Sequence, residues 1–390
     1  MRYHLLVTDA SKGTTRNLMN ELQVQSGAVI ALRLFDIAYS IDLQQAESLW
    51  AKRMGGTTSR SRLSTAPTKA VAFDVPPVLI SLGSLPITVE QKIVTAMVTA
   101  RLYDFGVVAF SLKISASSLS WSEFSLFANA VDRVIGPNVE TDLWSGLLTK
   151  IKDSLAPAIT RPNDSLLQED YLIAVVQQWN EPLKAIEIFN RINLVPLLSG
   201  ERRPLSEGAQ RDLLKQCFSY YEDDLVVLTW DRAFIYEPRS DCDVADILEV
   251  ANAQLLEMRY YDELLDDELP RMYDLVEQTH RATNLMAPRR FAHLARKLYT
   301  LVAEVTELTE KADNVLQVTE DIYLARIYMA ALELFRVPTV SAAVDRKLAI
   351  VRDTYAALYA EASDARGELL EIAIVFLIVL ELVVALMRHA

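Results

Sequence analysis

The sequence has few residues of the types that form cross-links or bind zinc. Among its 390 residues there are only two cysteines, Cys217 and Cys242, with no CxxC spacing, and four scattered histidines. This scarcity predicts neither a disulfide framework nor a Cys/His zinc site, and it disfavours a histidine-based catalytic dyad. We therefore expect a non-enzymatic protein from a reducing compartment and assign no catalytic residue, no cofactor, no metal and no small-molecule substrate.

Net positive charge and an apolar N-terminal run are also missing. The formal charge is −13, so the average field of the protein repels nucleic acids and anionic lipids, which excludes non-specific adhesion to either as the main activity. The first residues, MRYHLLVTDASKG, lack the apolar stretch of a signal peptide. We expect the targeting element to lie at the other end of the chain.

A long apolar run is present from Leu369 to Met387, LLEIAIVFLIVLELVVALM. As a helix it would reach roughly the ~30 Å of a bilayer core, which predicts a single-pass C-terminal anchor with the bulk of the chain in the cytoplasm, or in the mitochondrial matrix for a mitochondrial protein. A charge near the middle of such a run costs on the order of 2.5 to 3.5 kcal/mol, so we expect Glu381 to face protein or to stay protonated. Glu371, Phe376 and Glu381 are predicted at a membrane or oligomer interface; the alternative is a tail that packs in a soluble assembly.

The preceding chain predicts an α+β fold in four parts. Residues 1–67 suit a strand near Tyr3–Val7, a strand-helix unit and a polar linker at Gly55–Ser64, and residues 68–238 suit a mixed body of strands and helices. In the body we expect helices at Trp121–Val134 and Val139–Leu155 separated by Gly136 and Pro137, a helix at Leu205–Phe218 with Ser206 as a candidate N-cap, and strands at Asp170–Val176, Asp224–Thr229 and Ala233–Tyr236. Residues 239–366 are helical, with apolar residues at the alternating spacings of three and four that are typical of a coiled coil, and residues 367–390 contain the anchor. Asp262 is a polar position in this seam, where we expect it to fix register or to lie at an interface.

Two clusters of charged residues are candidates for binding. Arg202, Arg203 and Arg211, with Arg289 and Arg290 further along the chain, are the best candidates for contact with phosphate or RNA, although such pairs in an acidic protein more often form surface salt bridges. The acidic group Glu222, Asp223 and Asp224, with Asp231, has no EF-hand spacing, so solvated acids in a turn are favoured over a cation site.

Three segments resemble a known family. They are SYYEDDLVVLTWDRAFIYEP (Ser219–Pro238), ILEVANAQLLEMRYYDELLDDELP (Ile247–Pro270) and LLEIAIVFLIVLELV near the C-terminus. They resemble the "required for meiotic nuclear division" family, found in bacteria and mitochondria. The resemblance implies an α+β domain, a helical arm and a C-terminal transmembrane helix. For mitochondrial members it also implies homo-oligomers that support translation by holding ribosomes or messages near the membrane.

These features together predict a membrane-anchored oligomeric scaffold or tether, with membrane lipid and further copies of the chain as partners and ribosomes or RNA as a further possibility. One alternative is an enzyme or nucleotide-binding module in the body, favoured if acids and arginines around Glu222–Arg232 form a concave cluster. The other is an oligomeric pore lined by Glu381.

Overall fold

The computed structural model describes residues 22–54, 58–60, 76–137, 139, 142–163, 167–239, 243–280, 293, 296, 299–300, 302–303, 306 and 321–389. The strand expected near Tyr3–Val7 and most of the helical run expected at 291–322 lie outside these residues.

A ten-stranded sheet forms the centre of the molecule, in the order β10-β11-β12-β9-β1-β6-β5-β4-β3, with the short β7 pairing with β1. Every neighbouring pair is antiparallel except β12 and β9, which are parallel. The strands are β1 (Gln23–Asp36), β3 (Thr58–Arg60), β4 (Val78–Val89), β5 (Lys92–Leu102), β6 (Val107–Ala116), β7 (Leu119–Ser120), β9 (Gln168–Trp179), β10 (Gln216–Phe218), β11 (Leu225–Leu228) and β12 (Arg232–Tyr236). A separate two-stranded sheet pairs β2 (Ala38–Ile41) with β8 (Ile159–Pro162).

The central strands are covered on both faces, because successive side chains of a strand point to opposite sides. In β9, Leu172 and Ala174 contact one hydrophobic core, whereas Tyr171 and Ile173 contact the other. This is why the segment DYLIAVV is almost continuously apolar.

Short helices cover the first face. Ser120 begins α2 with a capping box, in which its hydroxyl accepts from the Glu123 amide and the Glu123 carboxylate accepts from the Ser120 amide. These elements are α1 (Leu43–Met54), α2 (Trp121–Ile135), α3 (Asp142–Leu155), the 3₁₀ turn η1 (Ala156–Ala158), α4 (Ala185–Arg191), α5 (Val195–Ser199) and α6 (Glu207–Leu213).

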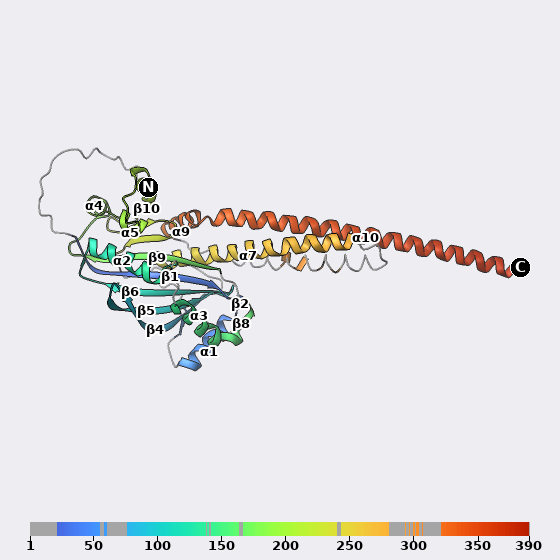
Figure 1. Cartoon of the computed structure of the whole chain (residues 1–390), viewed down its shortest axis with the longest axis horizontal. Coiled ribbons are helices and arrows are strands. Elements are labelled where there is room, and N and C mark those ends of the chain that lie inside the picture. The colour runs from blue at the N-terminus through green and yellow to red at the C-terminus, as the bar shows by residue number, and fades with distance from the viewer. Residues whose placement is uncertain are drawn as a thin grey trace.

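Long helices cover the second face. They are α7 (Asp243–His280), α9 (Ile322–Leu334) and α10 (Val337–His389), and their apolar residues share the second core with the sheet. We call α7 and α10 the helical arm. Figure 1 shows α10 running alongside α7 and continuing far beyond its end, away from the sheet. The fold is thus mixed α/β, with a large sheet and a helical C-terminal region, as the sequence predicted at this level.

A buried polar network fixes the start of α7 on the sheet. The Arg101 guanidinium of β5 contacts Asp246 Oδ1 at 2.7 Å and Glu249 Oε1 at 3.2 Å, and Tyr103 donates to Glu249 Oε1 at 2.9 Å. The apolar positions predicted along α7 face the sheet as well as the neighbouring helices. Packing against both accounts for the spacing of three and four residues between these positions.

Some local predictions were wrong. The predicted linker contains β3, which forms the sheet edge beside β4, and the helix predicted over Leu205–Phe218 ends early because Gln216–Phe218 pairs with β11. Ser206 is the N-cap of α6, as predicted. The strand β1, from the expected N-terminal unit, pairs with β6 and β9, so residues on both sides of position 67 share one sheet.

Gly106, in the turn between β5 and β6, provides a test of this packing. Its φ is +94°, and an added Cβ would lie 1.7 Å from the Ala38 carbonyl oxygen. We expect Gly106→Ala to lower the free energy of unfolding by roughly 3 kcal/mol or more, since backbone strain and a backbone clash add together. Gly83→Ala is the control, because Gly83 has a φ of +88° but no heavy atom near the added Cβ. If urea denaturation gave the two variants equal losses of unfolding free energy, the close approach at Gly106 would be contradicted.

Candidate functional site: a cleft between the sheet and the helical arm

A cleft of about 1450 Å³ lies where the sheet meets the helical arm. Its walls come from the start of β9, the turn between β11 and β12, α7 and the region between α9 and α10. Eight carboxylates line it against three guanidinium groups. The charged lining residues are Asp132, Glu169, Asp170, Glu201, Asp231, Asp262, Glu263, Asp266, Arg232, Arg259 and Arg336.

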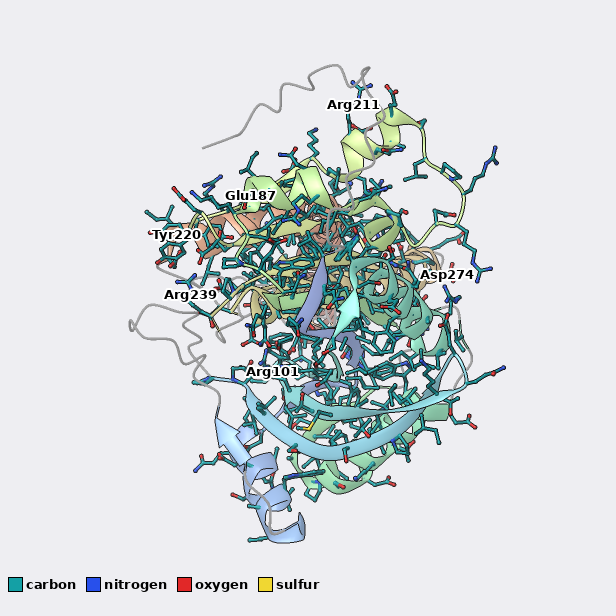
Figure 2. The ribbon with its side chains drawn as sticks, turned by 90° about the vertical axis from the view of Figure 1, so that its left-hand side faces the viewer. Arg101, Glu187, Arg211, Tyr220, Arg239 and Asp274 are labelled. Atoms are coloured by element: carbon teal, nitrogen blue, oxygen red, sulfur yellow. The ribbon has the colours of Figure 1, made fainter. Side chains whose placement is uncertain are left out.

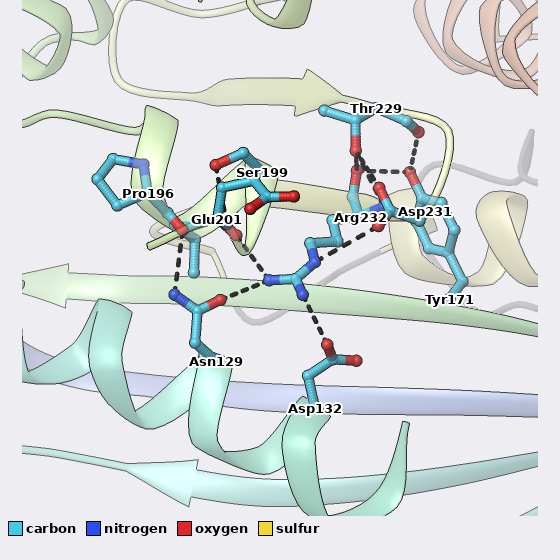
Figure 3. A network of polar contacts seen from close by, with 10 residues as sticks. Asn129, Asp132, Tyr171, Pro196, Ser199, Glu201, Thr229, Asp231 and Arg232 are labelled. Carbon is cyan, nitrogen blue, oxygen red and sulfur yellow. Dashed lines mark hydrogen bonds and ion pairs between the residues drawn. The ribbon is translucent and has the colours of Figure 1, made fainter. Parts of the chain in front are cut away.

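Arg232 ties together three elements at the cleft wall (Figure 3). Its Nη1 donates to Asn129 Oδ1 at 2.5 Å and to the Leu197 carbonyl at 3.0 Å, and its Nη2 donates to Asp132 Oδ2 at 2.6 Å. Its Nε lies 3.6 Å from Asp231 Oδ2. A Cβ added to Gly200 would lie 2.3 Å from Nη2, so the glycine at this position makes room for the Arg232 guanidinium. Arg232 therefore joins α2, the end of α5 and β12.

The same network shapes the turn between β11 and β12. The Tyr171 hydroxyl lies 2.9 Å from the Thr229 carbonyl and 2.8 Å from the Arg232 carbonyl, and Thr229 Oγ1 accepts from the Arg232 amide at 3.0 Å. Held in this way, the turn presents Trp230 to solvent with 73% of its surface exposed.

Burial raises the pKa of three carboxyls in the cleft. For Asp170, Asp231 and Glu169 the largest cause is desolvation, which disfavours the charged form, and nearby arginines partly oppose it. Arg33 and Arg232 act on Asp170, and Arg259 forms an ion pair with Glu169.

Asp262, the predicted polar seam residue, is also in the cleft lining. Lys347 of α10 contacts Asp262 Oδ1 at 2.6 Å and Asp266 Oδ1 at 2.7 Å, which joins the two helices of the arm within one chain. Its predicted role at an oligomer interface stays a prediction.

The structure does not bring the other charged candidates to the cleft. Arg202 and Arg203 are exposed in the segment after α5 and are not part of the cleft lining. Arg211 of α6 lies at the periphery of the body (Figure 2), and the candidates Arg289 and Arg290 lie outside the described residues. The acidic cluster is split, since Glu222 pairs with Lys184, and Asp224 Oδ1 accepts from the amides of Tyr220 and Tyr221. Only Asp231 reaches the cleft, and among the described residues no group of three or more His, Cys, Asp or Glu is placed to hold a metal ion.

The predicted anchor residues lie on the projecting part of α10. Ile374 to Val379 are six consecutive apolar residues, each 52–65% exposed, and Glu371 and Glu381 on either side are also exposed. Within the described residues, no single helix meets the length and hydropathy of a membrane span. The pair Ile322–Leu334 and Val337–Ala357, bent by 63°, meets them together by length and composition.

Two buried carboxyls, Asp36 at the end of β1 and Glu257 on α7, had no sequence signal. Asp36 and Glu257 are each 2% exposed, and Asp36 Oδ2 and Glu257 Oε2 have no hydrogen-bond partner. Burial raises the pKa of Asp36 to about 7, although Asn163 donates to its Oδ1 at 3.0 Å. Burial also raises the pKa of Glu257 well above its usual value, and the charge of Asp36 adds to this effect.

A family match covers the sheet and the helices on its first face. The family described as "Uncharacterized protein MJ0711, N-terminal domain" matches residues 26–243, more than half of the chain, from β1 to the first residue of α7. The chain belongs to this family. A relative with the same description, "Uncharacterized protein MJ0711" of Methanocaldococcus jannaschii, is 25% identical over 243 residues, which are 62% of this chain and 73% of the relative. No solved structure is significantly similar to the chain.

The range matched by the MJ0711 family contains the cleft residues of the body, among them Asp132, Trp230 and Arg232. The cleft walls formed by α7 and α10 lie beyond this range. Nothing in this match links the chain to the "required for meiotic nuclear division" family, so that resemblance stays a prediction.

Arg232 can be tested through stability. Removing the charge in Arg232→Met leaves Asp132 and Asp231 without their shared cation. We expect the free energy of unfolding to fall by roughly 2 to 3 kcal/mol, and not by more, because the two carboxylates are partly exposed. Arg133→Met, on α2 next to Asp132, is the control. Its pair with Glu90 is exposed, so the expected loss is below about 1 kcal/mol. Equal unfolding free energies for the two variants would contradict a structural role for Arg232.

Asp36 predicts a specific pH dependence. Because its folded pKa is raised, its contribution to stability is complete at low pH and is lost as pH rises from about 4 to about 7. Between pH 6 and pH 8 the free energy of unfolding of the wild type should fall by roughly 1.4 kcal/mol more than that of Asp36→Asn, because the substitution removes this titration. Urea unfolding at both pH values measures the difference, with Asp212→Asn on the exposed surface as control. The same pH slope in the wild type and Asp36→Asn would contradict the assignment.

Proposed function

We propose that the protein is a membrane-anchored scaffold that carries its α/β body on a helical arm and oligomerises through the arm and the C-terminal helix. The observation that carries this proposal is the run of exposed apolar residues Ile374–Val379 on α10.

The run covers every side of the helix. Consecutive residues of an α-helix are about 100° apart, so six of them go round the axis more than once. A helix that docks on one partner surface has a polar opposite face, whereas a helix that is apolar all round belongs in a protein core or in lipid. The six residues are exposed in the single chain. Lipid is the simplest environment that surrounds them, and the apolar sequence continues in both directions.

The arm connects this segment to the body without a break. Lys347 fixes α10 to α7, and α10 is one helix from Val337 to His389. From Lys347 to Ile374 the helix rises roughly 40 Å, so the body is held well away from the apolar segment. This geometry suits a tether. Glu371 and Glu381, placed on either side of the exposed run, are proposed to contact neighbouring copies, where a carboxylate is satisfied at lower cost than in lipid.

A second candidate function rests on the cleft. A concave cluster of acids and arginines that includes Asp231 and Arg232 favours ligand binding by the body. Its surplus of carboxylates disfavours a nucleotide, because phosphates are repelled. The ribosome or RNA role and the pore lined by Glu381 stay predictions.

Membrane binding of the full chain tests the anchor. Two lysines introduced within the run, in Ile374→Lys/Leu377→Lys, cost on the order of 2.5 to 3.5 kcal/mol each in a bilayer. We expect the wild type to stay in the membrane pellet after carbonate extraction and this variant to be released in large part.

Ile350→Lys is the matched control, because Ile350 is exposed on the same helix but lies near the body. It should remain in the pellet. Recovery of the wild type in the soluble fraction would overturn the anchor.

A further inference from the structure

We infer that the cleft between the sheet and the arm is a docking groove for a basic segment of a partner protein, one that presents lysine or arginine side chains. The inference goes beyond the anchor and holds whether or not α10 enters a bilayer, because the groove is made by the body and the parts of the arm beside it.

The groove is elongated along α7. The α7 residues in its wall extend from Asn252 to Asp266, with Leu255, Arg259 and Asp262 between them. At ~1.5 Å per residue this wall is about 21 Å long. Six residues of extended chain span about the same length. The volume of about 1450 Å³ also exceeds the roughly 300–1,000 Å³ of small-ligand pockets, so a peptide fits better than a metabolite.

The charge of the groove selects a cation. Two of its three arginines are engaged within the chain, Arg232 with Asp132 and Asp231, and Arg259 with Glu169. In contrast, no ion pair of the described residues includes Glu201 or Glu263. A concave site lined by one sign of charge concentrates the field and attracts the opposite sign. Glu201 and Glu263 are therefore available for the ammonium or guanidinium groups of a partner.

Trp230 adds a second kind of recognition. It lies in the groove lining on a turn that the Tyr171 and Thr229 hydrogen bonds hold in place, with 73% of its surface exposed. An indole ring is the strongest side-chain partner for lysine and arginine through cation–π contact. A basic side chain can contact an exposed tryptophan and the carboxylates beside it at the same time.

Fluorescein-labelled hexalysine is the probe, because its extended length matches the groove. Its binding to the full chain in uncharged detergent micelles is measured by anisotropy at low salt. We expect Trp230→Ala and the double variant Glu201→Lys/Glu263→Lys each to weaken binding at least tenfold. Both change exposed residues, and circular dichroism confirms that they fold.

The matched control is Glu207→Lys/Asp212→Lys on α6, which makes the same charge change on an exposed surface outside the groove. It should weaken binding less than twofold. Equal weakening by the control and the groove variants would mean diffuse attraction to an acidic protein and would overturn the proposal.

Spermine distinguishes a peptide groove from a small polyamine site. If an extended segment is the occupant, unlabelled hexalysine displaces the probe at a concentration at least tenfold below that of spermine. Equal potency would assign the site to a polyamine and would overturn the peptide proposal.

Discussion

Burial of the central strands on both faces is the constraint on which the rest of the structure depends. Strands β1 and β9 have apolar side chains on both sides, so the sheet requires two covering layers. The helices α1–α6 provide one layer. The other is provided by α9 and the first parts of α7 and α10, so the helices that complete the core also begin the arm. Movement of the arm near the body would therefore expose the second core.

This arrangement explains where the cleft lies. The arm helices cover the second face but lie beside the turn between β11 and β12, and the polar residues at this border cannot join either core. Arg232 and Lys347 stabilise the two sides of the cleft, one within the body and one within the arm. The remaining carboxylates and Trp230 face the space between them.

Local patterns predicted much of the fold. The apolar segments of β9, β11 and β12, the break at Gly136–Pro137 between α2 and α3, and the N-cap at Ser206 all follow from neighbouring residues and were predicted. The edge strands β3 and β10 were not, because each has only three residues, polar in β3 and mixed in β10, and depends on pairing with β4 or β11. Of the cleft, the sequence pointed to Asp231 and Asp262 as separate candidates, but not to their meeting with Asp132 and Asp170, which depends on tertiary packing.

The exposed apolar part of α10 is proposed to lie in lipid, and site-directed spin labelling tests this directly. A spin label at position 376, in a chain whose two cysteines are replaced by alanine, reports its surroundings in lipid vesicles, and a label at position 350 is the reference. We expect molecular oxygen to relax the label at position 376 more than a water-soluble nickel complex does, and we expect the opposite order at position 350. Water-like relaxation at both positions would contradict it.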